Sequence, residues 1–515
     1  MKTISKCELA VVEHLSRRTF LRTAALGSAS LVLGSKSKAQ SAKLARKPNL
    51  IVFLPDQQRA DTLACYGARR LSAPNLDKLA SQSCVFERAY VTQAVCTPSR
   101  SSLLTGTWPH ANGCTHNNAR LRTDSRCLPE MMGDNDYRTA YIGKWHLGYE
   151  VLAQHGFEQW ISIVHSGEAR QNPDGVSKIL SDYDNFLLSK GLKPDNKKKA
   201  VFSHKFATTL PIELSKPKFV ETKACNFLEQ QRRDPFILFV SFFEPHPPYD
   251  GPLNGEHPLD QSDLDATRDH IFGEQMPLRY RLRQESDRKR FGASKKQLRI
   301  KRNYLGLVTE VDRSIGVILS KLEQLGLADN TIVVHTSDHG DMMGAHGLFG
   351  KRVSFEQAVR VPYLVRLPGQ SRMLSISQPV SHIDFVPTLL DLLGKAPHEQ
   401  CAGKSRGPLL RGQSMAPETL FIEWNPFAQR FVKGTRLATP DEIRRVSNES
   451  TRVAISVDGW KICLRDHDKN ELYNLRSDPS EEQNLYSSAE HQAVIGRLTG
   501  EIHRWQESIG DNLKV

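Results

Sequence analysis

Four short apolar runs, each ended by polar residues, constrain the fold of this chain more than any other feature. They span residues 49–54, 139–142, 236–243 and 331–336. Unbroken apolar runs of this length are typical of strands buried on both faces, as in a parallel sheet. Between the last two runs, residues 304–325 carry apolar side chains three and four positions apart, which predicts a helix stopped by Gly326. This order predicts an α/β fold whose sheet has a large parallel component and helices on both faces.

The polar residues that follow the runs indicate where a site would form. The segments are Pro55–Gln58, Gly143–His146, Glu244–Pro248 and Ser337–Asp341. In sheets of this kind, ligands bind beyond the carboxyl ends of the strands. Because all four segments fall at such ends, we expect them to meet in one active site.

Composition excludes several classes of protein without choosing a function. The 515 residues carry a net charge of +13, and their hydrophobic share of 39% does not fit a polytopic membrane, collagen-like or disordered chain. Nine cysteines are too few for a disulfide scaffold. The basic excess predicts an acidic partner, which could be nucleic acid, anionic lipid or an anionic substrate.

The N-terminus has the pattern of an export signal. Arg17 and Arg18 are followed by Phe-Leu and a weakly apolar run of small residues that is too short to span a bilayer. Residues 1–40 are therefore predicted to be a twin-arginine signal peptide, read by the twin-arginine export machinery. The protein would be periplasmic or secreted, with no transmembrane span. The segment carries seven Lys/Arg and two Asp/Glu, so about +8 of the charge belongs to the mature chain.

Cys96 to Gly106 is the most informative motif. Thr97 and Pro98 are good first residues for a helix, which would place Cys96 at its positive end. A cysteine there, near Arg100, could be an activated thiolate or a buried structural residue. These two residues alone favour the structural interpretation.

The full string Cys-x-Pro-Ser-Arg, followed by Leu-x-Thr-Gly, resembles the signature of the formylglycine-dependent sulfatases of the alkaline phosphatase superfamily. Further segments resemble the family in the same order: Gly143–Gly148, Thr336–Asp341, His346–Leu348 with Lys351, and Leu472–Leu475 with Asp478, Glu481 and Asn484. The resemblance covers residues 47–490. It implies an alkaline-phosphatase-like fold, with a large mixed, mostly parallel sheet flanked by helices and a smaller C-terminal α+β subdomain on a short antiparallel sheet. We expect a catalytic domain over 47–400 and the subdomain over 417–515.

The resemblance also implies a nucleophile and a metal site. A formylglycine-generating enzyme would oxidise Cys96, and the hydrated aldehyde has one hydroxyl to attack sulfur and another to expel sulfate afterwards. The implied metal ligands are Asp56, Gln57, Asp338, His339 and the residue formed from Cys96. Many members have aspartate in place of Gln57 and asparagine in place of His339. Ca²⁺ is the expected ion, and the His339 nitrogen leaves Mn²⁺ or Zn²⁺ as alternatives.

The remaining implied roles concern charge and protons. Arg100, Lys144 and Lys351 match positions that bind the nucleophile or the sulfate oxygens, Lys144 and Lys351 facing substrate. His146 matches a base for the collapse step. His246 matches the leaving-group acid, which also binds substrate and is aided by Lys351. Lone histidines in Pro/Gly-rich loops are often surface groups, so His346 is left open, and Trp108 and Trp145 are expected to pack rather than to bind substrate.

Residues 279–302 carry eleven Lys/Arg and two acidic residues. They form either a solvated basic insertion or a contact surface for a polyanionic glycan. We expect no nucleic-acid binding, because only Tyr280 and Phe291 could stack on bases.

The leading hypothesis is therefore an exported sulfatase that cleaves a sulfated carbohydrate or another organic sulfate. A phosphonate monoester or phosphodiester hydrolase of the same superfamily is the alternative. A glycan- or lipid-binding protein with a degenerate site is disfavoured by the intact set of site residues. Once the signal is removed and Cys96 modified, seven cysteines remain, so at least one stays unpaired.

Overall fold

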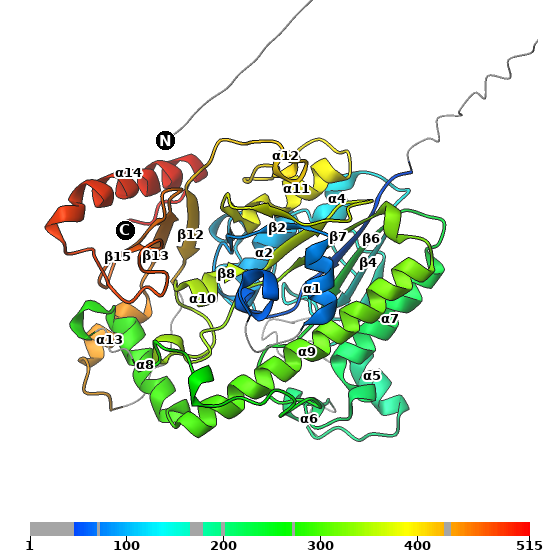
Figure 1. The fold of residues 1–515 in the computed structure, drawn as a ribbon, viewed down its shortest axis with the longest axis horizontal. Coiled ribbons are helices and arrows are strands. Elements are labelled where there is room, and N and C mark those ends of the chain that lie inside the picture. Colours follow the sequence, from blue (N-terminus) through cyan, green and yellow to red (C-terminus); the bar gives the residue numbers. More distant parts are fainter. Residues whose placement is uncertain (1–45, 69–72, 165–178, 197–200, 270–272, 427–433) are drawn as a thin grey trace, which may run out of the picture. The chain divides into compact units, whose positions relative to one another are not determined.

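An eight-stranded sheet runs through the compact unit formed by Lys47–Val515 (Figure 1). The structure is a computed structural model that describes residues 46–68, 73–164, 179–196, 201–269, 273–426 and 434–515. The predicted signal peptide lies outside the described residues. The strand order is β10 (Leu374–Ile376), β2 (Cys84–Phe86), β9 (Tyr363–Arg366), β7 (Thr331–Thr336), β1 (Asn49–Phe53), β6 (Phe236–Ser241), β4 (Arg138–Gly143), β5 (Gln159–Ser162). Strand β9 is antiparallel to both neighbours and the other pairings in this sheet are parallel, so the predicted mixed, mostly parallel sheet is confirmed.

The four predicted runs are the four central neighbours β7, β1, β6 and β4. All five residues of β1 are buried. Phe53 near the end of β1 pairs with Val240 on one side and His335 on the other, and Gly143 of β4 pairs with Ser241. The carboxyl ends are therefore nearly level, and the segments that follow them start at one edge of the sheet.

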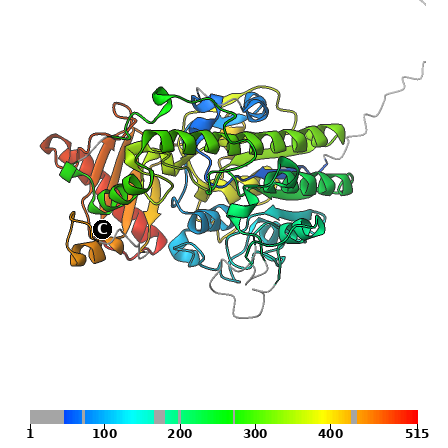
Figure 2. The same ribbon diagram turned by 90° about the horizontal axis from the view of Figure 1, so that it is seen from below.

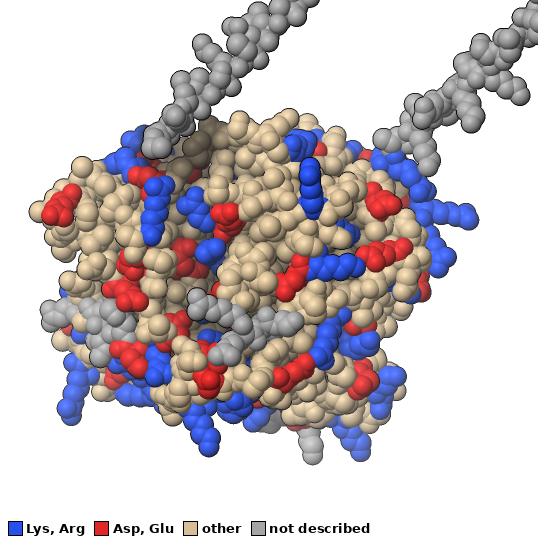
Figure 3. Space-filling model, in the orientation of Figure 1, with Lys and Arg blue, Asp and Glu red and all other residues tan. Residues whose placement is uncertain are grey.

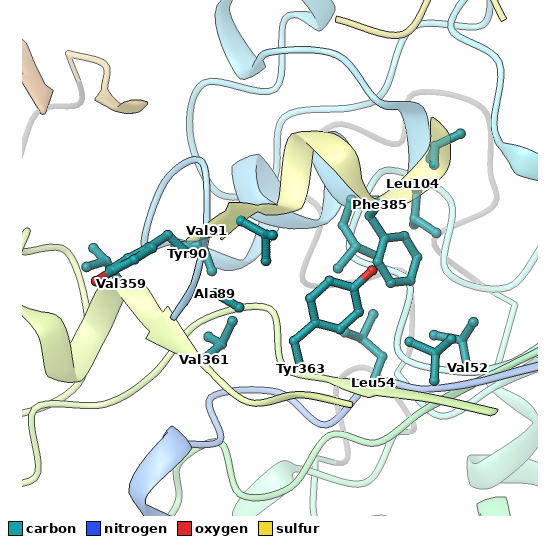
Figure 4. Close-up of a cluster of buried hydrophobic side chains, with 14 of the residues drawn as sticks. Val52, Leu54, Ala89, Tyr90, Val91, Leu104, Val359, Val361, Tyr363 and Phe385 are labelled. Carbon is teal, nitrogen blue, oxygen red and sulfur yellow. The ribbon is translucent and has the colours of Figure 1, made fainter. Parts of the chain in front are cut away.

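Two layers of helices cover the sheet because its strands present apolar side chains alternately to each face. Leu50, Val52 and Leu54 join one apolar cluster, whereas Ile51 and Phe53 join the other. The first cluster includes α2 (Cys96–Thr105), α4 (Leu128–Met132) and α11 (Phe385–Leu392), and the second includes α1 (Pro74–Ser81), α5 (Asp182–Ser189), α7 (Lys216–Gln230) and α9 (Ser294–Gln324). Figure 4 shows Val52 and Leu54 of the first cluster below Phe385 and Leu104.

The basic region is helical and only partly exposed. Residues 278–291 form helix α8, and α9 begins at Ser294, well before the apolar repeat that starts at Tyr304. Long polar side chains such as Lys, Arg and Gln favour helix even without an apolar stripe, which periodicity alone does not reveal. The exposed part of the region contains Arg288, Lys289, Arg290, Lys295, Lys296 and Arg299, but Arg279 is buried. Only part of it is therefore the solvated surface expected from the sequence.

The C-terminal region has the predicted antiparallel sheet, with order β12 (Leu420–Trp424), β13 (Thr451–Ile455), β14 (Trp460–Arg465), β15 (Glu471–Asn474). Helix α14 (Gln492–Ile509) packs on it through Leu498 and Ile502. Figure 2 shows α8 beside these orange and red strands. The remaining elements are β11 (Val380–Ser381), β3 (Ala89–Tyr90) and β8 (Arg360–Val361), which form a third sheet, and α3 (Pro109–Asn112), α6 (His204–Ala207), α10 (Glu356–Val359), α12 (Gly407–Leu410) and α13 (Pro440–Ser447).

Three further observations concern the whole described chain. Its eight cysteines are all free thiols. None of its helices combines the length and the apolar character needed to cross a membrane. On the face seen in Figure 3, Lys and Arg side chains are interspersed with Asp and Glu. The charge of the protein is thus mixed on this face rather than gathered in one basic surface.

Candidate active site

The predicted site residues meet at the carboxyl edge of the central strands. Asp56 follows β1, Lys144 follows β4, and Asp338 follows β7, while Cys96 begins α2. Gly143 permits this convergence, because its φ is 124° and a Cβ there would lie 1.8 Å from the carbonyl oxygen of Ser241. The backbone N–H of Lys144 can therefore donate to that same oxygen at 3.0 Å.

Cys96 is fully buried among charged and polar groups. Its Sγ lies 3.0 Å from Lys351 Nζ, 3.2 Å from His339 Nε2, 3.8 Å from Asp56 Oδ1 and 4.0 Å from Lys144 Nζ. Burial raises the pKa of the Cys96 thiol, but the charges of Lys144 and Lys351 outweigh it and hold this pKa well below its ordinary value. The position therefore stabilises a negatively charged nucleophile.

Arg100 joins the two predicted metal-binding carboxylates. Its Nε donates to Asp338 Oδ2 at 2.8 Å and its Nη2 to Asp56 Oδ2 at 3.2 Å. Its Nη1 donates to the Lys144 carbonyl oxygen and to Ser241 Oγ, each at 2.9 Å. All three nitrogens thus bind protein groups, so Arg100 orients Asp56 and Asp338. Its expected contact with the nucleophile or sulfate stays a prediction.

Asp56 is ionised although it is buried. Lys144 Nζ donates to its Oδ2 at 2.6 Å. Burial and the negative Cys96 raise the pKa of Asp56, but Lys144, His246 and Lys351 together lower it below its ordinary value. Asp56 therefore offers an anionic oxygen to a cation.

Hydrogen bonds fix the orientation of His339 and Gln57, the two residues that differ from the pattern expected at these positions. His339 Nδ1 donates to the carbonyl oxygen of Gly340 at 2.9 Å, so Nε2 is the ring nitrogen that faces Cys96. The Nε2 of Gln57 donates to the carboxylate of Asp341, which can only accept. Gln57 Oε1 consequently faces inward, where Lys351 Nζ donates to it at 2.7 Å.

These residues fit a divalent cation. The ligand atoms of Asp56, Cys96, Asp338 and His339 all lie within 4.8 Å of one another. Two carboxylates and the Gln57 amide oxygen are hard donors of the kind that Ca²⁺ prefers, and the imidazole nitrogen also suits Mn²⁺ or Zn²⁺.

Two histidines face the open side of this centre. His146 has a φ of 64°, its backbone N–H donates to Glu150 Oε1 at 2.7 Å, and its Nε2 contacts Asn118 Oδ1 at 3.0 Å. His246 Nδ1 donates to the Pro247 carbonyl oxygen at 2.7 Å. Burial, with Lys351 and Lys144, lowers the pKa of His246 to about 4. Both histidines line a cavity of about 390 Å³, together with Asn117, Asn118, Lys144, Gly148, Glu150, Val164, His204 and Phe243.

The family follows from comparison with known proteins. The model of the sulfatase family matches residues 48–395, and the model of the C-terminal region of N-sulphoglucosamine sulphohydrolase matches residues 344–508. The chain belongs to the sulfatase family. It is therefore a sulfuric ester hydrolase.

Several relatives and solved structures resemble this sulfatase over most of its length. N-acetylglucosamine-6-O-sulfatase of Bacteroides thetaiotaomicron is 27% identical and covers 95% of this chain and 91% of its own. Ulvan-active sulfatase of Formosa agariphila is 27% identical over 96% of this chain and 89% of its own. A structure in complex with its substrate D-glucosamine-2-N,6-O-disulfate has a TM-score of 0.69 at 23% identity, covering 91% of this chain and 99% of that one. These findings confirm the predicted family and fold.

The other candidate residues of the sulfatase pack against aromatic side chains. His346 is buried and stacks on Phe355, with ring centres 4.2 Å apart. Trp145 is fully buried against Tyr141 at 5.0 Å, and Trp108 packs on Trp505 at 4.9 Å. Both tryptophans therefore pack in the protein, as expected.

The sequence did not identify the residues that hold the ligands in place. Tyr249 and Asp341 orient Gln57, Ser241 binds Arg100, and Asn118 with Glu150 orients His146. Asp341 is part of a segment that the sequence singled out, so it could have been included. Ser241 lies inside the apolar run 236–243, whereas Tyr249, Asn118 and Glu150 lie at positions where the sequence shows no spacing or motif that marks them.

Proposed function

We propose that this sulfatase is exported and hydrolyses the sulfate ester of a carbohydrate, through a formylglycine made from Cys96 and a divalent cation, with Ca²⁺ the expected ion. The observation that carries the proposal is the placement of Cys96. Its Sγ lies within 4.0 Å of the ammonium groups of Lys144 and Lys351 and of an imidazole and a carboxylate. Such a position suits an anionic oxygen nucleophile as well as it suits a thiolate.

The charges of the site favour an anionic substrate. Arg100, Lys144 and Lys351 outnumber the carboxylates of Asp56 and Asp338 around Cys96. Asp56, Gln57, Asp338 and His339 would hold the cation, which supplies charge neutralisation for the nucleophile and a sulfate oxygen. Lys144 and Lys351 then stabilise the negative charge that develops on the sulfate oxygens.

Proton transfer falls to the two histidines. The contact of His146 Nε2 with Asn118 Oδ1 makes Nε2 the donor, since an amide oxygen only accepts, and leaves Nδ1 to take a proton in the collapse step. His246 Nδ1 is a donor to the Pro247 carbonyl, so the proton for the leaving alcohol would be carried on Nε2. Lys351 is the second donor near Cys96. A bound anionic sulfate ester would raise the low pKa of His246 and favour its protonation.

The relatives support a carbohydrate substrate. N-acetylglucosamine-6-O-sulfatase, ulvan-active sulfatase and iduronate 2-sulfatase of Mus musculus are among them, the last 31% identical over 67% of this chain and 65% of its own. Their sugars differ, so they support the class of substrate rather than one sugar.

Mass spectrometry tests the nucleophile. Protein coexpressed with a formylglycine-generating enzyme should contain formylglycine at position 96 and release sulfate from an aryl sulfate. Protein made without that enzyme should keep the thiol and be inactive. Full activity with an unmodified thiol would refute the mechanism.

Chelation tests the cation. Dialysis against a chelator should abolish sulfate release. Ca²⁺, Mn²⁺ and Zn²⁺ are then added back one at a time, and the ion that restores sulfate release is the one the site uses. Activity that survives chelation would count against a metal at Asp56, Asp338 and His339.

A phosphonate monoester or phosphodiester hydrolase is the second candidate function. The phosphonate monoester hydrolase of Silicibacter pomeroyi has a TM-score of 0.72 at 20% identity, covering 90% of this chain and 96% of its own. That likeness supports the shared fold alone. Turnover of an aryl sulfate and an aryl phosphodiester by one preparation separates the candidates, and we expect kcat/KM to be higher for the sulfate.

Export is tested separately. Replacing Arg17 and Arg18 by lysine should retain the protein in the cytoplasm, while a variant with both arginines intact reaches the periplasm or medium. Equal export of both forms would show that another signal is used.

A further inference from the structure

Six exposed cations gather where α8 meets α9, at the lower edge of the compact unit in Figure 1. Residues 288–299 contain six Lys/Arg and no Asp or Glu. The six side chains, which we call the basic junction, are Arg288, Lys289, Arg290, Lys295, Lys296 and Arg299. Lys289 lies 2.8 Å from Glu285, and Arg299 lies 3.7 Å from a carboxylate. No carboxylate in the described part of the chain forms an ion pair with the other four, so the junction carries positive charge that the protein does not neutralise.

The position of two of these cations is unfavourable for the helix that carries them. Lys295 and Lys296 lie in the first turn of α9, which contains no acidic residue. The N-terminus of a helix has a partial positive charge, so cations there destabilise it. Arg288, Lys289 and Arg290 lie in the last turn of α8, where cations are favourable. Helix stability thus accounts for the second group but not for the first, whose repulsion a bound anion would offset.

A tight turn holds the two groups of cations beside each other. Only residues 292–293 separate α8 from α9. A Cβ at Gly292 would lie 2.4 Å from the Arg288 carbonyl oxygen, so the turn requires glycine there. The ammonium of Lys296 donates to the Arg290 carbonyl oxygen at 2.5 Å, which joins the two helices and leaves the charge without a counter-ion. The backbone of the junction is therefore arranged before any ligand binds, which lowers the entropic cost of binding.

The basic junction is attached to the segment that carries Lys351. Phe291, at the end of α8, packs on Phe349 with ring centres 4.5 Å apart. The backbone N–H of Phe349 donates to Asp287 Oδ2 at 3.0 Å. Two residues after Phe349, Lys351 Nζ lies 3.0 Å from Cys96 Sγ. One end of this short segment thus contacts the helix that carries the junction, and the other end contacts the proposed nucleophile position.

We propose that the basic junction binds sulfate groups of a sulfated polysaccharide whose chain also presents a sulfate ester at Cys96. This inference rests on the proposed function of the Cys96 site. Sulfate groups recur along such a chain, so one molecule can contact both places. Each exposed ion pair is weak by itself, but contacts made at once by one chain reinforce each other. A polymer should therefore bind more tightly than a single sulfated sugar.

The side chains of the junction fit a polysaccharide better than the other common polyanions. Phe291 is the only aromatic residue of 288–299, and its ring packs on Phe349 instead of being free to stack on nucleic-acid bases. None of the residues 288–299 exposes a large apolar side chain. A helix that lies on a membrane presents apolar side chains to the lipid, so the junction lacks that feature. What remains is a charged surface without an apolar component.

Equilibrium binding of fluorescent dextran sulfate to the full protein tests the inference, with unsulfated dextran of equal length as the reference. Dextran sulfate is a suitable probe because it repeats sulfate esters along a glucan chain. We expect dextran sulfate to bind and dextran not to bind. Dextran sulfate should also slow the turnover of an aryl sulfate by the formylglycine form, because one chain would occupy both the junction and the site at Cys96.

Two double variants remove different halves of the junction. Arg288→Gln with Arg290→Gln shortens the charge of α8, and Lys295→Gln with Lys296→Gln shortens that of α9. Each double variant should weaken the binding of dextran sulfate about 2- to 30-fold, as expected for the loss of two exposed ion pairs. Neither should change kcat/KM for the aryl sulfate, since these four side chains lie outside the site at Cys96.

Arg232→Gln with Arg233→Gln is the matched control. These two arginines are exposed and lie between α7 and β6, at the edge of the sheet opposite to the site. Their loss changes the net charge by the same amount, and the affinity for dextran sulfate should stay that of the unaltered protein. Thermal melting verifies that each variant is folded.

The outcomes separate this inference from the proposed function. Equal losses of affinity in the junction and control variants, or dextran sulfate that does not slow aryl sulfate turnover, would overturn the inference. Tighter junction-dependent binding of an oligonucleotide of equal charge, or of vesicles of anionic lipid, would overturn it too. If dextran sulfate binding depends on the junction and no sulfate is released from the aryl sulfate, the proposed function fails while the anion-binding surface stands.

Discussion

Two buried groups of charges in this protein are built differently. Around Cys96, the cations Arg100, Lys144 and Lys351 surround the carboxylates of Asp56 and Asp338. In the C-terminal region, each buried cation has its own carboxylate. Arg452 binds Asp511 at 2.6 Å, Lys461 binds Glu481 at 2.8 Å and Glu356 at 3.0 Å, and Arg465 binds Glu471.

The different ratio of cations to carboxylates indicates that the two groups of buried charges have different roles. These buried ion pairs hold the β13–β14 region to its neighbours, so breaking one leaves an unpaired buried charge. In the proposed formylglycine form, where position 96 is uncharged, the three cations outnumber the two carboxylates, and such an excess becomes favourable when an anion enters. The Cys96 centre is thus prepared for a ligand, whereas the C-terminal pairs are complete without one.

Removing Cys96, the proposed nucleophile, should have the largest effect and should change activity without changing stability. Cys96→Ala removes a buried side chain that no disulfide uses, so we expect kcat to fall by about 10⁴-fold or more, in line with loss of a nucleophile elsewhere. The melting temperature should change little. Sulfate release and a thermal melt of the same preparation measure both, and substantial residual turnover would indicate another site or a contaminant.

Lys461→Met should act on stability instead. It leaves Glu481 and Glu356 without their buried partner, so the free energy of unfolding should fall by about 3–5 kcal/mol. Urea unfolding measures this, and kcat of the folded protein should be unchanged. Lys461→Arg, which keeps the charge, should lose less. A loss of kcat without loss of stability would contradict the comparison.

The same substitution at Lys351 should give the opposite result. Lys351→Met removes a cation 3.0 Å from Cys96 Sγ, and loss of one such donor costs about 2.7–4 kcal/mol of transition-state stabilisation, or about 10²–10³-fold in kcat. In the proposed formylglycine form the centre has excess positive charge, so the melting temperature should not fall. If Lys351→Met and Lys461→Met lose stability alike, the distinction between the two regions is wrong.

The smallest effect concerns pH. His335 in β7 is fully buried, and burial lowers its pKa to about 3. Below about pH 6.5, His335 takes up a proton in the unfolded chain but stays neutral in the folded protein. The free energy of unfolding therefore decreases as the pH falls below this value. His335→Leu should reduce the stability lost between pH 7 and pH 5 by about 2 kcal/mol.

Urea unfolding at the two pH values measures that difference. His467→Leu is the control from the C-terminal region, since His467 is exposed, and it should leave the pH dependence as it is. An unchanged slope in His335→Leu would show that other groups account for acid sensitivity.

The sequence alone determined the central sheet and most of the candidate site residues that meet at its edge. Burial of a strand on both faces requires an unbroken apolar run, so β1, β4, β6 and β7 can be recognised in the sequence. The residues that follow these strands then lie at one edge of the sheet. The string from Cys96 to Gly106 indicated the family, and the family in turn implied the expected roles of Lys144, His246 and Lys351.

Only the tertiary structure decided how these groups are held and balanced. Arg100 proved to join Asp56 and Asp338, Gln57 is oriented by Asp341, and Arg279 with Arg283 fixes the backbone at Lys351 and Arg352. Side-chain donors of this kind pair with acceptors far along the chain, and local spacing carries no record of such pairs. The basic region shows this most clearly. Its charge was evident from the sequence, but the burial of Arg279 against Glu449 and Trp424 depends on a sheet formed more than a hundred residues later.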